Sequence, residues 1–250
     1  MITRKSPEQI ALMRRAGKVV AEMHEECTRA SKPGVSTLEV DAVARDVIKR
    51  RGAQSNFLNY HGFPAVVCTS PNNVIVHGIP SDTVVLEEGD ILSIDCGAII
   101  EGWHADAAVT IPVGDVDDES KQLIEVTRAS LEAAIDLVVE GRRLGDVGAA
   151  VEAVAVGAGF TVVREYVGHG IGTAMHEEPQ VPNYGPAGRG LKLKDGLVLA
   201  IEPMVNAGGP ETEVRDDGWT VVTRDGRRSA HFEHTIAVTE HGPEVLTLPW

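Results

Sequence analysis

The sequence of 250 residues is long enough for one large domain or for two fused halves that share a core. Its 37 acidic and 23 basic residues give a net charge of −14, which repels phosphate backbones and excludes a general nucleic-acid-binding role. A secretory signal and a run of roughly 20 apolar residues are both absent, and three widely spaced cysteines favour a reducing compartment, so we expect a cytoplasmic protein with no membrane partner.

Helix start and stop signals divide the chain into two helices followed by strands, twice over. Ser6 with Gln9, and Ser36 with Glu39, form capping boxes that begin two helices, and Gly52 can end the second. The four predicted helices run from Pro7 towards Ala30, from Ser36 to Gly52, from Asp117 to Gly141 and from Asp146 to about Gly159. Strand-like sequence covers residues 65–112 and returns from residue 161. This order predicts an α+β fold with helices packed on one face of a curved antiparallel β-sheet.

The chain also resembles itself at an offset of 107 residues. Two windows match at this offset, one in the helical part and one in the strand-like part, and the offset places Asp95 on Glu202. No linker rich in Pro, Gly or Ser separates the two copies. We therefore expect a single catalytic domain over residues 1–250, made of two pseudo-symmetric halves of approximately 1–112 and 113–250.

Four carboxylates interrupt otherwise apolar, strand-like sequence: Asp95, Asp106, Glu202 and Glu233. A buried unpaired carboxylate costs several kcal/mol, and no basic residue lies near any of the four in these strands, so metal ions are the better partners. Asp95 and Asp106 flank a predicted hairpin turn, and any loop of even length places both on one face of the sheet. Glu202 and Glu233 are their expected counterparts in the second half, so the site should lie at the pseudo-twofold interface.

Three of the nine histidines stand out by their surroundings: His77, His169 between two glycines, and His176. His24, among charges in the first helix, is expected to face solvent. A site of four carboxylates and one or two imidazoles favours Mn²⁺, Fe²⁺ or Co²⁺, with Zn²⁺ as an alternative. Cys96 alternates away from Asp95 and is expected in the core, so no thiol nucleophile competes. These residues alone predict a dinuclear metallohydrolase whose substrate stays open.

The motifs at these residues resemble those of the type I methionine aminopeptidases, metal-dependent enzymes with the pita-bread fold. The resemblance extends over essentially the whole chain, with the motifs in the family's order. They are His77-Gly78-Ile79-Pro80, Ile94-Asp95, His104-Ala105-Asp106, Gly168-His169-Gly170-Ile171-Gly172, His176-Glu177-Glu178-Pro179-Gln180, Ile201-Glu202-Pro203-Met204-Val205-Asn206, Asp217-Gly218-Trp219-Thr220 and Glu233-His234-Thr235.

The resemblance implies residue roles as well as an activity. Asp95, Asp106, His169, Glu202 and Glu233 would bind two divalent ions, and Glu202 would also take a proton from the water that bridges them. His77 and His176 would hydrogen-bond the substrate and stabilise its tetrahedral intermediate. The implied activity is removal of the N-terminal methionine from nascent polypeptides when the second residue is small, by attack of the bridging hydroxide.

The resemblance also implies a methionine pocket and a monovalent cation site. Tyr60, Cys68 and Trp219 match pocket positions, whereas Phe57, Phe63 and Met175 depart from the residues that other members carry there, and Gly97 stands where a threonine is common. These departures put the strictness of methionine preference in question. Backbone around Asn72 and Val74, together with Ser229, resembles the site for Na⁺ or K⁺.

Two other functions remain as alternatives. A prolidase or Xaa-Pro aminopeptidase has the same fold and ligand set, but those chains normally carry an additional N-terminal domain. A non-catalytic pita-bread protein would bind RNA or a protein partner, and such proteins lose metal ligands, whereas all five ligand types are present here. We expect a monomer that meets nascent chains at the ribosome and has no specific nucleic-acid target.

Overall fold

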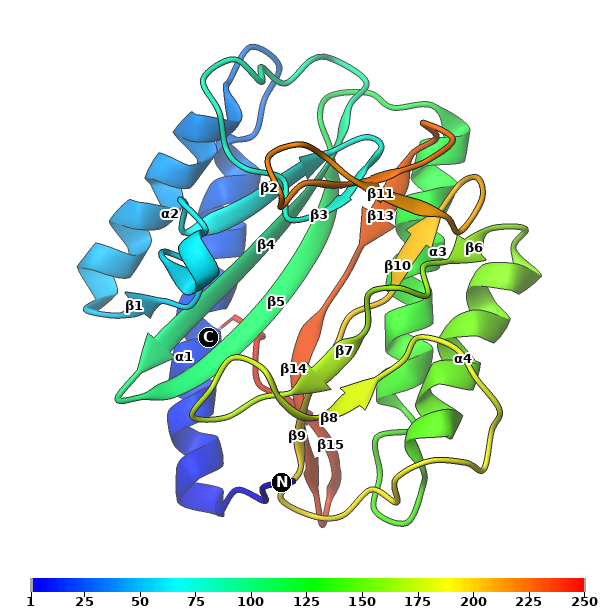
Figure 1. The fold of residues 1–250 in the computed structure, drawn as a ribbon. Coiled ribbons are helices and arrows are strands. Elements are labelled where there is room, and N and C mark those ends of the chain that lie inside the picture. The colour runs from blue at the N-terminus through cyan, green and yellow to red at the C-terminus, as the bar shows by residue number, and fades with distance from the viewer. Residues whose placement is uncertain (1, 250) are drawn as a thin grey trace.

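The computed structural model describes residues 2–249 and shows helices on one side of antiparallel strands (Figure 1). Its helices are α1 (Pro7–Ala30), α2 (Thr37–Arg51), the short 3₁₀ helix η1 (Tyr60–Gly62), α3 (Asp118–Ile135) and α4 (Leu144–Gly157). The strands are β1 (Gln54–Ser55), β2 (Val67–Pro71), β3 (Val74–Val76), β4 (Ile91–Ile100), β5 (Trp103–Pro112), β6 (Thr161–Val162), β7 (Gly168–Gly170), β8 (Glu177–Val181), β9 (Val198–Ile201), β10 (Met204–Asn206), β11 (Thr212–Val214), β12 (Val221–Thr223), β13 (Ser229–His231), β14 (His234–Thr239) and β15 (Gly242–Val245).

The predicted starts of the first two helices are confirmed. Ser6 and Ser36 each accept a hydrogen bond from the backbone N–H three residues later, and the side chains of Gln9 and Glu39 complete the capping boxes. Gly52 ends α2 with a φ of 61°, a left-handed conformation that glycine adopts without steric cost. Local sequence signals therefore determine where both helices begin and where α2 ends.

The bounds of α3 and α4 differ from the prediction. The third helix ends at Ile135 rather than at Gly141, because the chain then makes short turns in which the N–H of Leu137 bonds to Ala134 and Val138 enters the core. The fourth helix begins at Leu144 rather than at Asp146, because the Asp146 carboxylate accepts a hydrogen bond from the N–H of Arg143 and so acts from inside the first turn.

The strands pair in antiparallel fashion throughout the described residues and form four hydrogen-bonded groups. One contains β1, β4, β2 and β5, and another runs in the order β15-β14-β9-β7-β8; two smaller groups are β13-β10-β6 and β11-β12-β3. In Figure 1, α1 lies behind β4 and β5, and α3 lies behind β10 and β13. The predicted α+β class, with helices on one face of antiparallel strands, is confirmed.

The apolar core consists mainly of two clusters. One lies between α1, α2 and the strands β2, β4 and β5, and its buried members all fall within residues 16–113. The second lies between α3, α4 and the later strands, and all of its buried members except Ile91 fall within residues 116–238. Val109 on β5 packs against both clusters, so β5 lies at the boundary between them.

The two parts of the fold meet along a seam, which we define as the contact of β5 with residues 229–239. Ala108 and Glu233 form a backbone bridge here: the N–H of Glu233 donates to the Ala108 carbonyl at 2.9 Å, and the reverse bond is 3.3 Å. The Thr110 hydroxyl donates to the carbonyl of His231 and accepts from its N–H, both at 2.8 Å. Threonine hydroxyls thus replace missing ladder hydrogen bonds along the seam.

Replacing Thr235 with valine should lower the free energy of unfolding by about 1–3 kcal/mol. The Thr235 hydroxyl accepts from the N–H of Asp106 at 2.9 Å and donates to the Asp106 carbonyl at 2.7 Å, so the variant leaves two buried backbone groups unpaired. Urea denaturation measures the loss. Thr239→Val is the matched control, because that hydroxyl bonds to Gly242 at the half-exposed end of the same strand; equal losses in the two variants would contradict this reading of the seam.

Candidate metal centre and substrate pocket

A pocket of about 140 Å³ opens beside the seam and joins a polar end to an apolar end. Every residue that the sequence predicted for the metal ions, the catalytic groups and the methionine pocket lines it. The lining residues are Phe57, Tyr60, Phe63, Cys68, His77, Asp95, Asp106, His169, Met175, His176, Glu202, Trp219 and Glu233.

The β4–β5 hairpin places Asp95 and Asp106 on one face, as predicted from a loop of even length. The connection is the two-residue turn Glu101–Gly102, and both of these residues have positive φ. In the resulting register Asp95 faces Ala108 and Asp106 faces Gly97, so the two carboxylates are diagonal neighbours. Cys96 alternates to the other face and is fully buried in the cluster under α1 and α2, which confirms its predicted place in the core.

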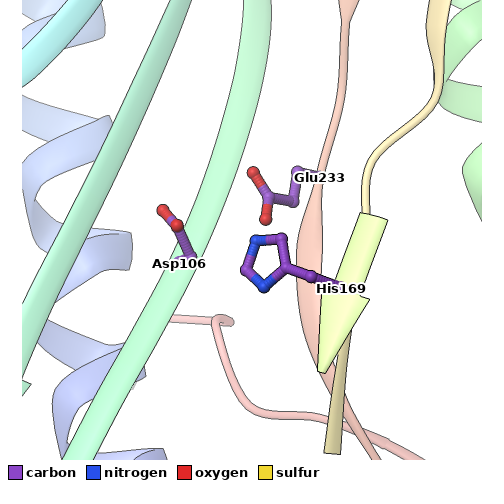
Figure 2. Close-up of side chains that lie close together, drawn as sticks. All are labelled: Asp106, His169 and Glu233. Carbon is purple, nitrogen blue, oxygen red and sulfur yellow. The ribbon is translucent and has the colours of Figure 1, made fainter. Parts of the chain in front are cut away.

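The other members of the site come from the second half of the chain. Glu202 directly follows β9, Glu233 lies between β13 and β14, and His169 is the central residue of β7. Figure 2 shows the side chains of Asp106, His169 and Glu233 close together, and one ligand atom from each lies within 4.8 Å of the others. The Nε2 atom of His169 is 3.5 Å from Oε1 of Glu202.

No basic side chain of the pocket lining offsets the negative charge that these carboxylates carry when ionised. No lysine or arginine is among the lining residues, and within residues 2–249 the Oδ1 atoms of Asp95 and Asp106 and Oε1 of Glu233 are buried without a hydrogen-bond partner. Burial raises the pKa of Asp95 to about 7 and raises the pKa of Asp106, Glu202 and Glu233 well above their usual range. Divalent cations would stabilise the ionised form of these buried groups, and oxygen-preferring divalent metal ions fit the donor set.

The three histidines of the pocket are held in different ways. The Nδ1 atom of His169 is 2.9 Å from the Gly170 carbonyl, which leaves Nε2 directed at the carboxylates. Burial lowers the pKa of His77 and of His169 to about 4, so both imidazoles are neutral near pH 7. His176 lies at the rim, where its Nδ1 is 2.7 Å from the hydroxyl of Tyr60.

The apolar end of the pocket is an aromatic and sulfur-lined wall. Phe57, Phe63, Cys68 and Met175 are buried, and the rings of Phe63 and Trp219 meet edge to face with centroids 5.2 Å apart. The positions that depart from the usual pattern, Phe57, Phe63 and Met175, therefore take part in the wall itself.

Two features of the structure lie outside what the sequence indicated. His24 was expected to face solvent, but this expectation is wrong: the side chain is half-buried, its Nε2 is buried with no hydrogen-bond partner in residues 2–249, and burial lowers its pKa to about 4. The threonines of the seam were missed, because strand-like sequence marks a threonine as a strand residue and does not reveal its partner across 129 positions.

The residues suggested for the monovalent cation site do not line this pocket. Its segments are neighbours, since the N–H of Ser229 donates to the Asn72 carbonyl at 2.9 Å, and Val74 pairs with Val222. That carbonyl has a second lone pair available, and Asn72 has a φ of 52°. The cation site stays a prediction.

The sequence pattern of metallopeptidase family M24 matches residues 11–240. The chain belongs to metallopeptidase family M24. This M24 chain is 49% identical over 247 residues to methionine aminopeptidase 1 of Bacillus subtilis, with 99% of each chain covered. A methionine aminopeptidase crystal structure from Thermotoga maritima superposes with a TM-score of 0.98 at 45% identity, covering 99% of this chain and 100% of that one. The resemblance to methionine aminopeptidases and the predicted pita-bread fold are both confirmed.

A more distant M24 structure bears on the fold alone. Prolidase from Pyrococcus furiosus superposes with a TM-score of 0.79 at 21% identity, and the match covers 99% of this chain but 66% of the prolidase. The helices of this M24 chain, within residues 2–249, include none long and apolar enough to cross a membrane.

Proposed function

We propose that this protein removes the N-terminal methionine from polypeptides whose second residue is small, as a metal-dependent aminopeptidase. The observation that carries the proposal is the single pocket in which a cluster of carboxylates and imidazole adjoins a narrow apolar wall. The relatives named methionine aminopeptidase, at 45–49% identity over nearly the whole chain, support the same activity and do not favour the prolidase or binding-protein alternatives.

Two divalent ions, Mn²⁺, Fe²⁺, Co²⁺ or Zn²⁺, would be held by Asp95, Asp106, His169, Glu202 and Glu233. The buried, unpartnered carboxylate oxygens support this assignment, and the seam explains why both parts of the fold contribute ligands. When bound, such ions lower the pKa of water and polarise the scissile carbonyl of the peptide.

The remaining chemistry falls to three side chains. Glu202, open to the pocket and next to His169, takes the proton from the attacking water and passes it to the leaving amine. His77 and His176 donate hydrogen bonds to the peptide and to the oxygen of its tetrahedral intermediate. The bond from Tyr60 to Nδ1 of His176 leaves Nε2 of that ring free to face the pocket.

The shape of the apolar wall supports preference for methionine. A thioether side chain is unbranched and polarisable, and it gains from contact with aromatic rings such as those of Phe63 and Trp219.

A competition experiment tests the activity. The protein is stripped with a chelator, each divalent metal is added back in turn, and a Met-Ala-Ser peptide and an Ala-Pro-Ser peptide are offered in one tube. We expect free methionine only when metal is present, with the proline peptide intact, as read by mass spectrometry. Cleavage of the proline peptide would favour the Xaa-Pro alternative, and no cleavage with any metal would favour a non-catalytic binding protein.

The cellular context follows as part of the proposal. Three cysteines without disulfide partners are compatible with the cytoplasm, where nascent chains are the substrates at the ribosome. We propose a single catalytic domain that acts as a monomer and has no specific nucleic-acid target, with the monovalent cation site near Asn72 in a structural role.

Replacing Cys96 with alanine should leave kcat/KM within about twofold of the wild-type value, because its thiol lies on the core side of β4. Cys68→Ala is the informative contrast. That thiol lines the pocket, so its loss should raise KM for the methionine peptide. Steady-state kinetics on both variants measure the difference, and an inactive Cys96→Ala protein of normal stability would contradict the assignment.

A further inference from the structure

Lys5, near the start of the chain, is buried together with a single acidic partner. Its Nζ donates to Oε2 of Glu177 at 2.8 Å and to the hydroxyl of Thr3 at 2.8 Å, and the exposed fractions of the Lys5 and Glu177 side chains are 4% and 11%. The Thr3 hydroxyl donates to the same oxygen at 2.6 Å. The backbone here is fixed as well, since the N–H of Lys5 donates to the Gly196 carbonyl at 2.7 Å.

The other oxygen of Glu177 holds a loop that leads into the pocket. Oε1 accepts from the N–H of Thr173 at 2.9 Å and from the N–H of Ala174 at 3.3 Å. Lys5 packs directly on this loop, because a Cβ added at Gly172 would lie 2.5 Å from Cε of Lys5. One carboxylate therefore ties residues 3–5 to residues 172–174.

The same loop carries two residues that line the pocket, Met175 and His176. His176 immediately precedes Glu177, and its ring reaches Tyr60 on one side and lies with its centroid 4.3 Å from that of His169 on the other. Since His176 is exposed at the rim, its placement depends on the loop backbone as well as on these two ring contacts.

We propose that the Lys5–Glu177 ion pair positions His176 for catalysis, an inference that rests on the proposed aminopeptidase function. A buried ion pair is a poor source of stability, because desolvation offsets its attraction, but it holds its groups in one geometry. Burial by itself would raise the pKa of Glu177, but the hydrogen bonds from Lys5, Thr3 and the Ala174 N–H and the charge of Lys5 together lower the net pKa, so Glu177 is ionised near pH 7. Neither Lys5 nor Glu177 lines the pocket, so both act through the loop.

Replacing Lys5 with methionine tests the proposal. We expect kcat for the Met-Ala-Ser peptide to fall about 10- to 100-fold with KM changed less than about threefold, because a displacement near 1 Å in a catalytic group has effects of this size. Arg4→Met is the matched control: Arg4 lies one residue away in an exposed pair with Asp195, and its loss should leave kcat unchanged. Kinetics are measured well below the unfolding temperature of each variant.

A second readout follows the position of His176 without using turnover. In isotope-labelled, Zn²⁺-supplemented protein, the imidazole NMR signals of His176, assigned by their loss in His176→Gln, should shift in Lys5→Met and stay in place in Arg4→Met. If Lys5→Met folds poorly, the double variant Lys5→Met/Glu177→Gln removes both buried charges and should still show the lower kcat and the shifted signals.

The outcomes separate the two proposals. A folded Lys5 variant with wild-type kcat and unshifted His176 signals overturns the positioning role, whatever the substrate. If wild-type protein cleaves neither peptide with any metal, the aminopeptidase function fails, and the NMR comparison still decides whether the ion pair places His176.

Discussion

Replacing Glu202 with glutamine should lower kcat for the Met-Ala-Ser peptide by about 10³-fold or more while the fold is retained. Glutamine has nearly the same shape but cannot accept the proton of the attacking water at neutral pH. The backbone of Glu202 is held independently of its carboxylate, because its carbonyl accepts a hydrogen bond from the Asn183 side chain at 2.9 Å. Circular dichroism and thermal unfolding should therefore resemble those of the wild type.

Metal content distinguishes the two roles proposed for Glu202. If its loss acts through proton transfer, the variant should retain most of its metal by mass spectrometry while turnover falls. Loss of metal in proportion to activity would instead mean that Glu202 acts mainly as a metal ligand. Normal turnover would contradict both roles. Glu240→Gln, at an exposed residue just after β14, controls for the change of one charge and should have no effect.

Adding Mn²⁺ to the metal-free protein should stabilise it far more at pH 8 than at pH 5. Burial raises the pKa of Asp95 from 3.8 to about 7, so without metal this group contributes stability below about pH 4 that is lost as the pH rises through 7. Metal ions bind the carboxylates in their deprotonated form. At a free Mn²⁺ concentration of about 100 times its Kd, binding should raise the free energy of unfolding by about 2.7 kcal/mol at pH 8, but by little at pH 5. Thermal unfolding with and without Mn²⁺ at the two pH values measures this.

Buried histidines change the free energy of unfolding with pH in the opposite direction, so their contribution must be separated from that of the carboxylates. Burial lowers the pKa of His231 to about 3 and that of His24 to about 4, so the stability that these neutral rings contribute is present above pH 6.5 and is lost as the pH falls. The difference in stability with and without Mn²⁺ at each pH separates the contribution of the carboxylates from that of these histidines. His169→Ala should reduce the Mn²⁺ effect at pH 8, whereas an equal Mn²⁺ effect at both pH values would contradict a carboxylate site.

The candidate site was largely predictable because its residues conflict with their local sequence. Asp95 and Asp106 interrupt apolar strands, and the even loop of the hairpin determines their shared face by the alternation of strand residues. Local sequence reduced the histidines to three candidates, and the family resemblance then selected His169 as the ligand and supplied the residues of the apolar wall.

The features that the sequence could not predict depend on contacts between residues far apart in the chain. Lys5 and Glu177 are 172 residues apart, and a lysine before a helix is ordinarily an exposed residue, so its burial follows only from the tertiary fold. The predicted end of the third helix was wrong for a related reason. Residues 136–141 are compatible with a helix, but burial of Val138 in the second cluster turns the chain away first.

The division of the core into two clusters has a consequence for how the chain could be divided. A cut at the exposed connection between Gly114 and Asp115 would give two fragments, each containing nearly all of one apolar cluster. The first fragment would carry Asp95 and Asp106, and the second His169, Glu202 and Glu233, so neither alone could assemble the pocket. Peptidase activity would then report on reassociation of the fragments across the seam, with no added label.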